Sequence, residues 1–284
     1  MEKLAERVAV ITGGASGIGL GIARAGAAAG MKLALLDVEA GALAVARRGL
    51  EEQGASVIAV CADVSDPASL AAAAEQVLSR HGRIDLVCNN AGVLTQGALA
   101  DSSVRDWEWL VGVNLLGVVH GVRVFVQHIR AHGEGGHVVN TASIAGLSAL
   151  PGLGIYTATK HAVVALSEVL REELAPEGIG VSVLCPGGVR TRIHEAGRNR
   201  PAVLGGPDAS ASAAALGADA SASPAGLGPA VAEAGMDPRA VGERVLEAVR
   251  ANELYVLTHP EFRAAFAARA EAILAAYDRA ARPS

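Results

Sequence analysis

Seven short apolar runs alternate along the chain with longer segments that are rich in alanine or have helical spacing. The runs are RVAVIT (7–12), KLALLD (32–37), SVIAVCAD (56–63), IDLVCNNAG (84–92), GHVVNTAS (136–143), GVSVLCPG (180–187) and LYVLT (254–258). Most are continuous and β-branched, whereas a half-exposed strand alternates apolar and polar residues. The pattern is typical of strands that are buried on both faces of a parallel sheet.

The segments between these runs predict helices over residues 17–29, 39–53, 67–81, 103–131, 155–175 and 238–250, and residues 260–280 form a terminal helix. Repetition of strand, helix and strand favours right-handed crossovers and a doubly wound sheet. We therefore predict an α/β fold with a doubly wound parallel sheet, and a single domain over residues 1–284.

One region breaks this alternation. Residues 201–235, PAVLGGPDASASAAALGADASASPAGLGPAVAEAG, are rich in Ala, Gly, Ser and Pro. Such a low-complexity segment fits a surface insertion with no packed core. A long loop in a compact enzyme also fits a lid over a substrate cleft. We expect the base of the segment, near residues 190–205, to help form a pocket.

Composition narrows the possible partners. Hydrophobic residues make up 51% of the chain but aromatic residues only 3%, so the core is aliphatic. The net charge is −5 and there is no basic block, which argues against a nucleic-acid partner. No continuous apolar run approaches the roughly 18 residues of a membrane span, so we expect no membrane partner.

The cysteines and the first residues suggest a compartment. Cys61, Cys88 and Cys185 each belong to an apolar run, which fits reduced core thiols and not a disulfide framework. The opening residues, MEKLAERVAVITGG, enter a strand pattern without a signal-peptide pattern. We therefore expect a cytoplasmic protein.

No metal site is expected. His128 and His132 are four residues apart, but they lie near a predicted helix end, where the helix dipole favours histidine. No third ligand is evident near them. Trp107 and Trp109, early in the same helix, fit core packing or a subunit contact.

A glycine-rich turn, TGGASGIG (12–19), follows the first strand and opens the first helix. Its glycines, Gly13, Gly17 and Gly19, have the spacing G-x-x-x-G-x-G, and Ser16 and Ile18 complete the turn. Glycines allow a tight turn and close backbone approach, and a helix N-terminus offers free N–H groups to a pyrophosphate. The turn therefore predicts a dinucleotide site.

Asp37 ends the second strand, 18 residues after Gly19. A carboxylate there accepts hydrogen bonds from an adenosine ribose and repels a 2′-phosphate. No arginine or lysine stands beside it in sequence, since Val38 follows and Ser16 occupies the turn. We therefore predict NAD(H) as the cofactor and not NADP(H). The alternative is that Asp37 only caps the next helix.

Small or polar residues follow the next two strands. Asp63 and Val64 follow the third strand, and NNAG (89–92) follows the fourth. In open α/β sheets, ligands bind at the carboxyl ends of the strands. We therefore assign Asp63, Val64, Asn90, Ala91 and Gly92 to the cofactor site, with a structural turn role as the alternative for Asn89 or Asn90.

The stretch YTATK places Tyr156 and Lys160 one helical turn apart, so both side chains project from one face. Only three of the 24 basic residues are lysines, which makes a lysine at this position informative. A fixed ammonium favours the phenolate, so we expect Lys160 to lower the pKa of Tyr156. Tyr156 then becomes a candidate general acid and base.

Two further polar residues fit the same chemistry. Ser143 ends the fifth strand, and its hydroxyl can hydrogen-bond the reacting oxygen. Asn114 lies inside an apolar helix, where a buried amide requires hydrogen-bond partners. Asn114 therefore either satisfies backbone groups or holds a water near Lys160 that relays protons to solvent.

These motifs together resemble the short-chain dehydrogenase/reductase family. The matching pieces are TGGASGIG, Asp63, NNAG, Asn114, Ser143, YTATK and PGGVRT (186–191), and the resemblance covers residues 7 to about 195. It implies a Rossmann-like single domain with seven parallel strands, which forms a homotetramer or homodimer.

The resemblance also implies roles for individual residues. Tyr156 would be the general acid/base, Lys160 its pKa-lowering partner and ribose anchor, Ser143 the residue that orients the substrate oxygen, and Asn114 the keeper of a water relay. The cofactor contacts after the sixth strand would be Pro186, Gly187, Val189 and Thr191, with Val189 and Thr191 at the nicotinamide.

Three segments, GGHVVNTASIAGL, RIHEAGRNRP and LYVLTH, are similar to a subgroup that oxidises benzylic or other bulky secondary alcohols, including lignin-dimer side chains. The apolar loop GLSALPGLGI (146–155) is expected to form one wall of the substrate pocket. We therefore predict hydride transfer between NAD(H) and a moderately bulky secondary alcohol or ketone. The alternatives are an NADPH-dependent ketoreductase and an NAD(H)-binding sensor without turnover.

Overall fold

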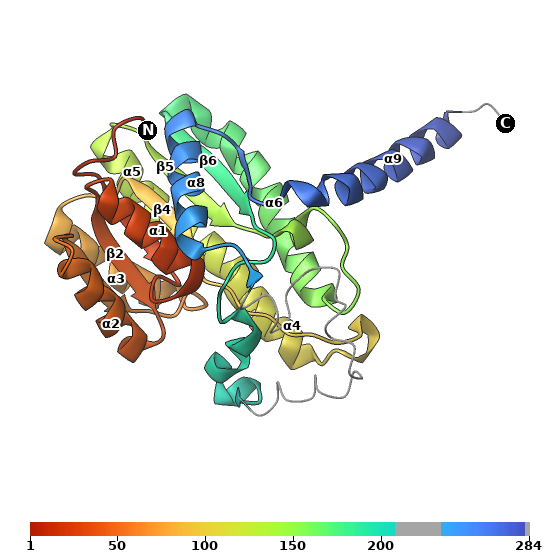
Figure 1. Cartoon of the computed structure of the whole chain (residues 1–284), viewed down its shortest axis with the longest axis horizontal. Helices are drawn as coiled ribbons and strands as arrows, with labels where there is room; N and C mark the ends of the chain where they lie inside the picture. The colour runs from red at the N-terminus through yellow and green to blue at the C-terminus, as the bar shows by residue number, and fades with distance from the viewer. Residues whose placement is uncertain (208–233, 282–284) are drawn as a thin grey trace.

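The computed structural model describes residues 1–207 and 234–281. Its centre is a seven-stranded sheet with the order β3-β2-β1-β4-β5-β6-β7, in which every neighbouring pair is parallel (Figure 1). The strands are β1 Val8–Thr12, β2 Lys32–Asp37, β3 Val57–Cys61, β4 Leu86–Asn89, β5 Gly136–Thr141, β6 Ile179–Cys185 and β7 Tyr255–Leu257. The predicted doubly wound α/β fold is confirmed, and the order reverses between β1 and β4.

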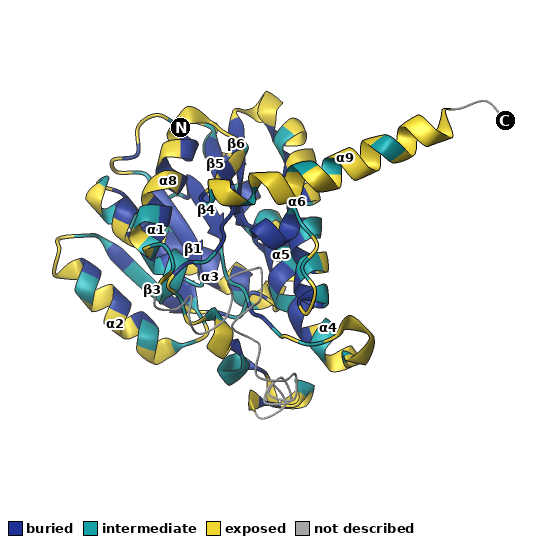
Figure 2. Ribbon diagram, turned by 45° about the vertical axis from the view of Figure 1, so that its right-hand side comes forward, coloured by how far each residue is buried: buried dark blue, intermediate teal, exposed yellow. Residues whose placement is uncertain are grey.

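Helices cover both faces of the sheet. Residues of α1 Gly17–Ala28, α2 Ala40–Glu51 and α8 Pro238–Ala251 pack in one apolar core. Residues of α3 Pro67–His81, α5 Gly117–His132 and α6 Gly154–Leu174 pack in a second core on the other face. The strands in the middle of the sheet are almost entirely buried, whereas the edge strands β3 and β7 are partly exposed (Figure 2). This burial on both faces is the reason that the strands read as continuous apolar runs.

The long helix predicted over residues 103–131 is interrupted. It consists of α4 Val104–Leu110, a π-helical turn Val111–Leu116 and α5. Asn114 lies in the π-helical turn, with its side chain bonded to the backbone of Val93. Single π turns often mark functional sites inside helices. This break depends on a contact with a distant segment, which helical periodicity does not reveal.

Among the described residues, the stretch Val104–His132 is long and apolar enough to cross a membrane by length and composition, with a hydropathy of 1.7 in an 18-residue window. This corrects the expectation that no run approaches that length. Half of the window is buried. Phe125, Val126 and Ile129 belong to the core beneath the sheet, which accounts for the apolar character of the stretch.

Helices α1 and α8 meet through their backbones at two glycines. A Cβ atom added to Gly242 would lie 2.4 Å from the carbonyl oxygen of Gly21, and one added to Gly21 would lie 2.0 Å from that of Pro238. No side chain fits at either contact without moving a helix.

We expect Gly242→Ala to lower the free energy of unfolding by about 3 kcal/mol, the upper part of the usual range for overpacking, because the obstruction is backbone. Chemical denaturation followed by circular dichroism measures the change. Gly49→Ala in α2 is the matched control, since nothing lies within 4 Å of its added Cβ. Alanine is a better helix former, so the control is expected to gain about 0.5 kcal/mol. Equal stability of the two variants would contradict the close contact.

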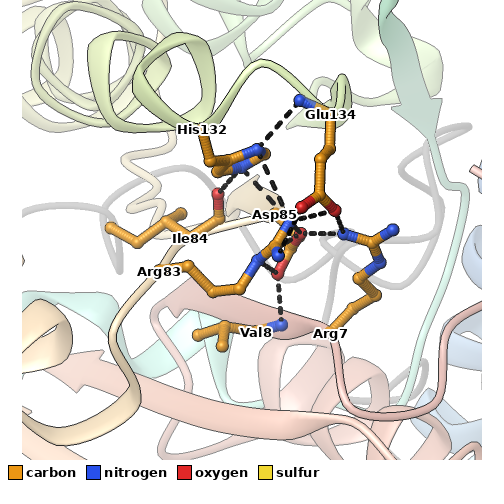
Figure 3. A network of polar contacts seen from close by, with 7 residues as sticks. All are labelled: Arg7, Val8, Arg83, Ile84, Asp85, His132 and Glu134. Atoms are coloured by element: carbon orange, nitrogen blue, oxygen red, sulfur yellow. Dashed lines mark hydrogen bonds and ion pairs between the residues drawn. The ribbon is translucent and has the colours of Figure 1, made fainter.

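A network of ion pairs and hydrogen bonds lies at the amino ends of the strands (Figure 3). The Asp85 carboxylate, which precedes β4, accepts hydrogen bonds from the Val8 backbone N–H at 2.9 Å and from Arg7 Nη1 at 2.8 Å. Arg83 donates to the same carboxylate from Nε and Nη2. Glu134 binds both arginines from the outside, at 2.8 and 2.9 Å. The network joins the starts of β1 and β4 to the segment that enters β5.

His132 belongs to this network. Its Nε2 lies 2.9 Å from the Ile84 carbonyl oxygen, and the backbone N–H of Glu134 donates to its Nδ1 at 3.2 Å. Within residues 1–207 and 234–281, no group of three His, Cys, Asp or Glu side chains is arranged to hold a metal ion.

The terminal helix α9, Arg263–Ala280, extends away from the body of the molecule (Figure 1). None of its residues is buried, and it exposes Phe266, Ile273, Leu274 and Tyr277.

The homotetramer or homodimer implied by the family resemblance stays a prediction, as does the cytoplasmic location. The lid hypothesis for residues 201–235 falls mostly on residues 208–233, which lie outside the described part of the chain.

Candidate active site

A cavity of about 310 Å³ lies along the carboxyl edge of the sheet. Most of the predicted site residues line it together: Gly13, Ser16, Gly17, Ile18, Asp37, Asp63, Val64, Asn90, Ala91, Gly92, Tyr156, Lys160, Pro186 and Thr191. They come from the ends of β1 to β4 and from the segments around α6 and after β6. The cavity therefore crosses the point at which the strand order reverses, where such sheets bind ligands.

The glycine-rich turn is shaped for close approach. Gly13 and Gly17 have positive φ angles of 62° and 51°, a region that favours glycine. Gly19 does not line the cavity, and a Cβ added there would lie 2.1 Å from the Gly13 carbonyl oxygen, so its part is to let the turn close. Ser16, the residue before α1, makes no side-chain cap, which leaves the first N–H groups of the helix free for an anion.

The two asparagines after β4 have different surroundings. Asn90 lines the cavity, while its side-chain amide donates to the Thr12 carbonyl oxygen at 3.0 Å and its backbone N–H to Thr12 Oγ1 at 2.9 Å. Asn89 is buried and donates to Asn140 Oδ1 at 2.9 Å. Asn90 therefore both joins β4 to β1 and faces the ligand space, whereas Asn89 is structural.

Two carboxylates mark the end of the cavity near β2 and β3. Asp37 accepts hydrogen bonds from the backbone N–H groups of Ala15 and Glu39, each at 3.1 Å. Burial raises the pKa of Asp37, and these bonds oppose the shift. Asp63 accepts from the Ser65 backbone N–H at 2.8 Å. Asp37 thus joins the glycine-rich turn to the start of α2.

Arginines do reach this end of the cavity, although none is near Asp37 in sequence. Arg192 and Arg198 line the cavity, and Arg198 forms an ion pair of 2.6 Å with Glu39. The absence of a basic residue next to Asp37 in sequence therefore does not keep arginines away from its end of the cavity. Arg198 lies 159 residues after Glu39 along the chain.

Tyr156 and Lys160 lie side by side in the cavity wall, only 4% and 2% exposed. Lys160 Nζ is 5.5 Å from the centre of the Tyr156 ring and donates to the Thr141 carbonyl oxygen at 2.8 Å. Burial raises the pKa of Tyr156 to about 12, opposed by the Ser143 hydroxyl. Burial also lowers the pKa of Lys160 to about 8.

The expected lowering of the phenol pKa is therefore wrong for the chain by itself. Removing the phenol from water disfavours the phenolate. The ammonium is also held by the Thr141 carbonyl oxygen over the ring, and not at the hydroxyl. The unliganded pair consists of a protonated phenol beside an amine that is mostly charged at neutral pH.

Ser143 and Asn114 lie behind the cavity wall. Ser143 Oγ accepts from the Ala145 backbone N–H at 3.1 Å and donates to the Pro186 carbonyl oxygen at 3.4 Å, a long and weak bond. Asn114 accepts from the Val93 N–H at 2.8 Å and donates to the Val93 carbonyl oxygen at 2.9 Å. Of its two expected roles, Asn114 takes the first, since it satisfies backbone groups. The water relay stays a prediction.

His259, which was not among the predicted site residues, is hydrogen-bonded to the segment after β6. His259 Nδ1 accepts from the Gly187 N–H at 3.0 Å, and Nε2 lies 3.0 Å from the Gly188 carbonyl oxygen. Gly187 does not line the cavity, and neither does Val189, which is buried and pairs with Met236. The motif LYVLTH contains this histidine and is the one signal that pointed to it.

The remaining walls of the cavity are largely apolar. Trp109, Val113, Ile193, Ala196 and Leu204 line it beside Tyr156. The loop over residues 146–155 does not line the cavity, in contrast to its expected position. Its apolar side chains pack instead in the cluster behind Tyr156, so the loop supports the wall without forming it.

The fold and this site define a Rossmann-like α/β protein whose ligand cleft lies at the carboxyl edge of the sheet and contains a buried Tyr–Lys pair. The model of the short chain dehydrogenase family matches residues 7–201. The chain belongs to this family of oxidoreductases.

Individual relatives agree along nearly the whole chain. A short chain dehydrogenase/reductase from Burkholderia phymatum, solved in complex with NAD, is 40% identical, with a TM-score of 0.86 and 96% of each chain covered. The C alpha-dehydrogenase of Sphingobium sp. strain SYK-6 is 34% identical over 96% of this chain and 87% of that protein. The apo form of LigO from the same strain is 34% identical, with a TM-score of 0.82, and the match covers 100% of this chain and 93% of LigO.

Proposed function

We propose that the protein transfers a hydride between NAD(H) and a secondary alcohol or ketone of moderately bulky, apolar or aromatic character. The observation that carries this proposal is the buried Tyr156–Lys160 pair in a cavity that also contains Asp37 and the glycine-rich turn. The open first turn of α1 and the two glycines with positive φ fit a bound pyrophosphate.

The cofactor would supply the hydride acceptor or donor, and the chain's own residues manage the proton. In ketone reduction, the Tyr156 hydroxyl donates its proton to the carbonyl oxygen as the hydride reaches the carbonyl carbon. In alcohol oxidation, the Tyr156 hydroxyl must first give up its own proton, and the resulting phenolate oxygen then takes the hydroxyl proton of the alcohol. The long Ser143 bond to Pro186 leaves that hydroxyl able to turn toward the substrate oxygen.

The raised pKa of Tyr156 keeps the phenol protonated at neutral pH, which suits proton donation. Lys160 would hold a ribose hydroxyl with the donor hydrogens that Thr141 does not use. Asp37 would accept bonds from the adenosine ribose. Tyr156, Lys160 and Asp37 all line the cavity.

The side chains that line the cavity support a particular class of substrate. Trp109, Val113 and Leu204 offer apolar surface beside Tyr156, and small charged substrates would leave it unfilled. The relative from Sphingobium is by name a C alpha-dehydrogenase, which supports a benzylic secondary alcohol as the first substrate to try.

A spectrophotometric screen at the NADH absorbance band, with benzylic and other secondary alcohols and the matching ketones, tests the proposal. We expect turnover with NADH and a kcat/KM about 100-fold lower with NADPH, because a carboxylate facing a 2′-phosphate costs several kcal/mol. A preference for NADPH would support the ketoreductase alternative. Binding of NADH without turnover on any substrate would support the sensor.

A further inference from the structure

Glu39 joins two distant parts of the cavity wall. It stands two residues after Asp37, just before α2. Arg198 and Asn199 end the 3₁₀ helix Ile193–Asn199, and both donate to Glu39 Oε1, at 2.6 and 3.0 Å. All three residues line the cavity at the end where Asp37 lies.

This ion pair is partly shielded and well braced. The side chains of Glu39 and Arg198 are 25% and 27% exposed. Arg198 Nη1 also donates to the carbonyl oxygens of Arg192 and Glu195, at 3.2 and 2.9 Å. The hydrogen bond from Arg198 holds the pKa of Glu39 below its usual range, so the carboxylate is ionised at neutral pH.

The second arginine at this end of the cavity is occupied too. Arg192 Nε donates to Glu195 Oε2 at 2.7 Å. Arginine binds phosphate through a planar fork of N–H donors. An arginine beside a nucleotide-binding carboxylate would therefore attract a 2′-phosphate, and in Arg198 the Nη2 donor is already bonded to Glu39.

We propose that Glu39 is a specificity-determining residue for the dinucleotide: it holds Arg198, the cation that would otherwise bind an adenosine 2′-phosphate beside Asp37. The inference rests on the proposed NAD(H)-dependent function and assigns part of that selectivity to a residue other than Asp37. The Asp37 carboxylate is bonded to two backbone N–H groups. It would repel a 2′-phosphate, and a free Arg198 would oppose that repulsion by attracting the same phosphate.

Equilibrium binding of NADH and NADPH, followed by nicotinamide fluorescence, tests this assignment without requiring turnover. In Glu39→Gln we expect NADPH to bind about tenfold more tightly than to wild type, the effect of one charge-assisted arginine–phosphate bond, whereas NADH affinity changes by less than about threefold. In the double variant Glu39→Gln/Arg198→Met the gain for NADPH is expected to disappear.

Glu177→Gln is the matched control. It breaks a bidentate pair with Arg130 of the same chemical type, and neither residue lines the cavity. Its affinity for both nucleotides is expected to equal that of wild type.

Two outcomes would overturn the inference while leaving the proposed function intact: NADH binds but Glu39→Gln gains nothing for NADPH, or the double variant keeps the gain. Failure of the wild-type chain to bind either nucleotide would instead overturn the proposed function, and this inference with it.

Discussion

Replacing Tyr156 by Phe is expected to lower kcat by about 10³-fold, the usual size of a general acid–base contribution. The substitution removes only the hydroxyl that exchanges a proton with the substrate oxygen, and the ring stays in its apolar cluster. NADH affinity and the free energy of unfolding are therefore expected to remain close to those of wild type. Steady-state kinetics, nucleotide fluorescence and chemical denaturation measure the three quantities.

Tyr255→Phe is the control for this result. Tyr255 is 45% exposed on the edge strand β7 and donates to Glu168 at 2.8 Å, and it does not line the cavity. Losing its hydroxyl is expected to leave kcat unchanged. If Tyr156→Phe kept wild-type turnover, or if both variants lost activity equally, Tyr156 would not be the proton-transfer group.

The apolar runs predicted the fold well because the central strands β1, β4, β5 and β6 are buried on both faces. Every predicted strand exists, and β2 has the predicted limits of residues 32–37. Local signals also fixed helix starts: Asp66 caps α3 by accepting from the Ala68 N–H, with Pro67 in the first turn. Such signals depend only on neighbours in sequence.

Contacts between distant segments were the part that the sequence left open. The π-helical turn depends on bonds between Asn114 and Val93, and the bridge at the β2 end depends on Arg198 meeting Glu39. Trp109 packs in an apolar core cluster, one of its two expected roles, but that cluster also contains Tyr156 and Trp109 lines the cavity, which was not expected. Neither hydrophobic periodicity nor motif spacing reveals which distant residues come into contact.

The pKa of Tyr156 failed as a prediction for a related reason. The spacing of YTATK correctly placed Lys160 beside the ring, at 5.5 Å from its centre. It did not reveal how completely the fold removes the phenol from water, and that burial dominates the shift. Burial is a property of the assembled wall, to which α4, α6 and the loop over residues 146–155 all contribute.

Asp85 joins the strand starts at the edge of the sheet opposite the cavity, and its replacement is expected to lower the free energy of unfolding about as much as Gly242→Ala does. The side chain is 1% exposed, and its carboxylate accepts from two arginines and from the Val8 N–H (Figure 3). Asp85→Ala leaves these donors unpaired. Breaking a buried ion pair costs about 3 to 5 kcal/mol, and we expect about 3 kcal/mol, since Arg7 and Arg83 are more than a quarter exposed and keep Glu134.

Chemical denaturation measures this loss, and Asp85→Asn provides a second variant if the alanine variant does not fold. Asn keeps one carbonyl acceptor, so its loss is expected to be smaller than that of alanine. Because the network lies at the amino ends of the strands, Asp85→Asn should retain wild-type kcat at low temperature, whereas Tyr156→Phe should retain stability. Glu134→Gln removes the 51% exposed outer carboxylate and is expected to cost much less. Equal losses for Glu134→Gln and Asp85→Ala would show that the buried carboxylate does not hold the strand starts together.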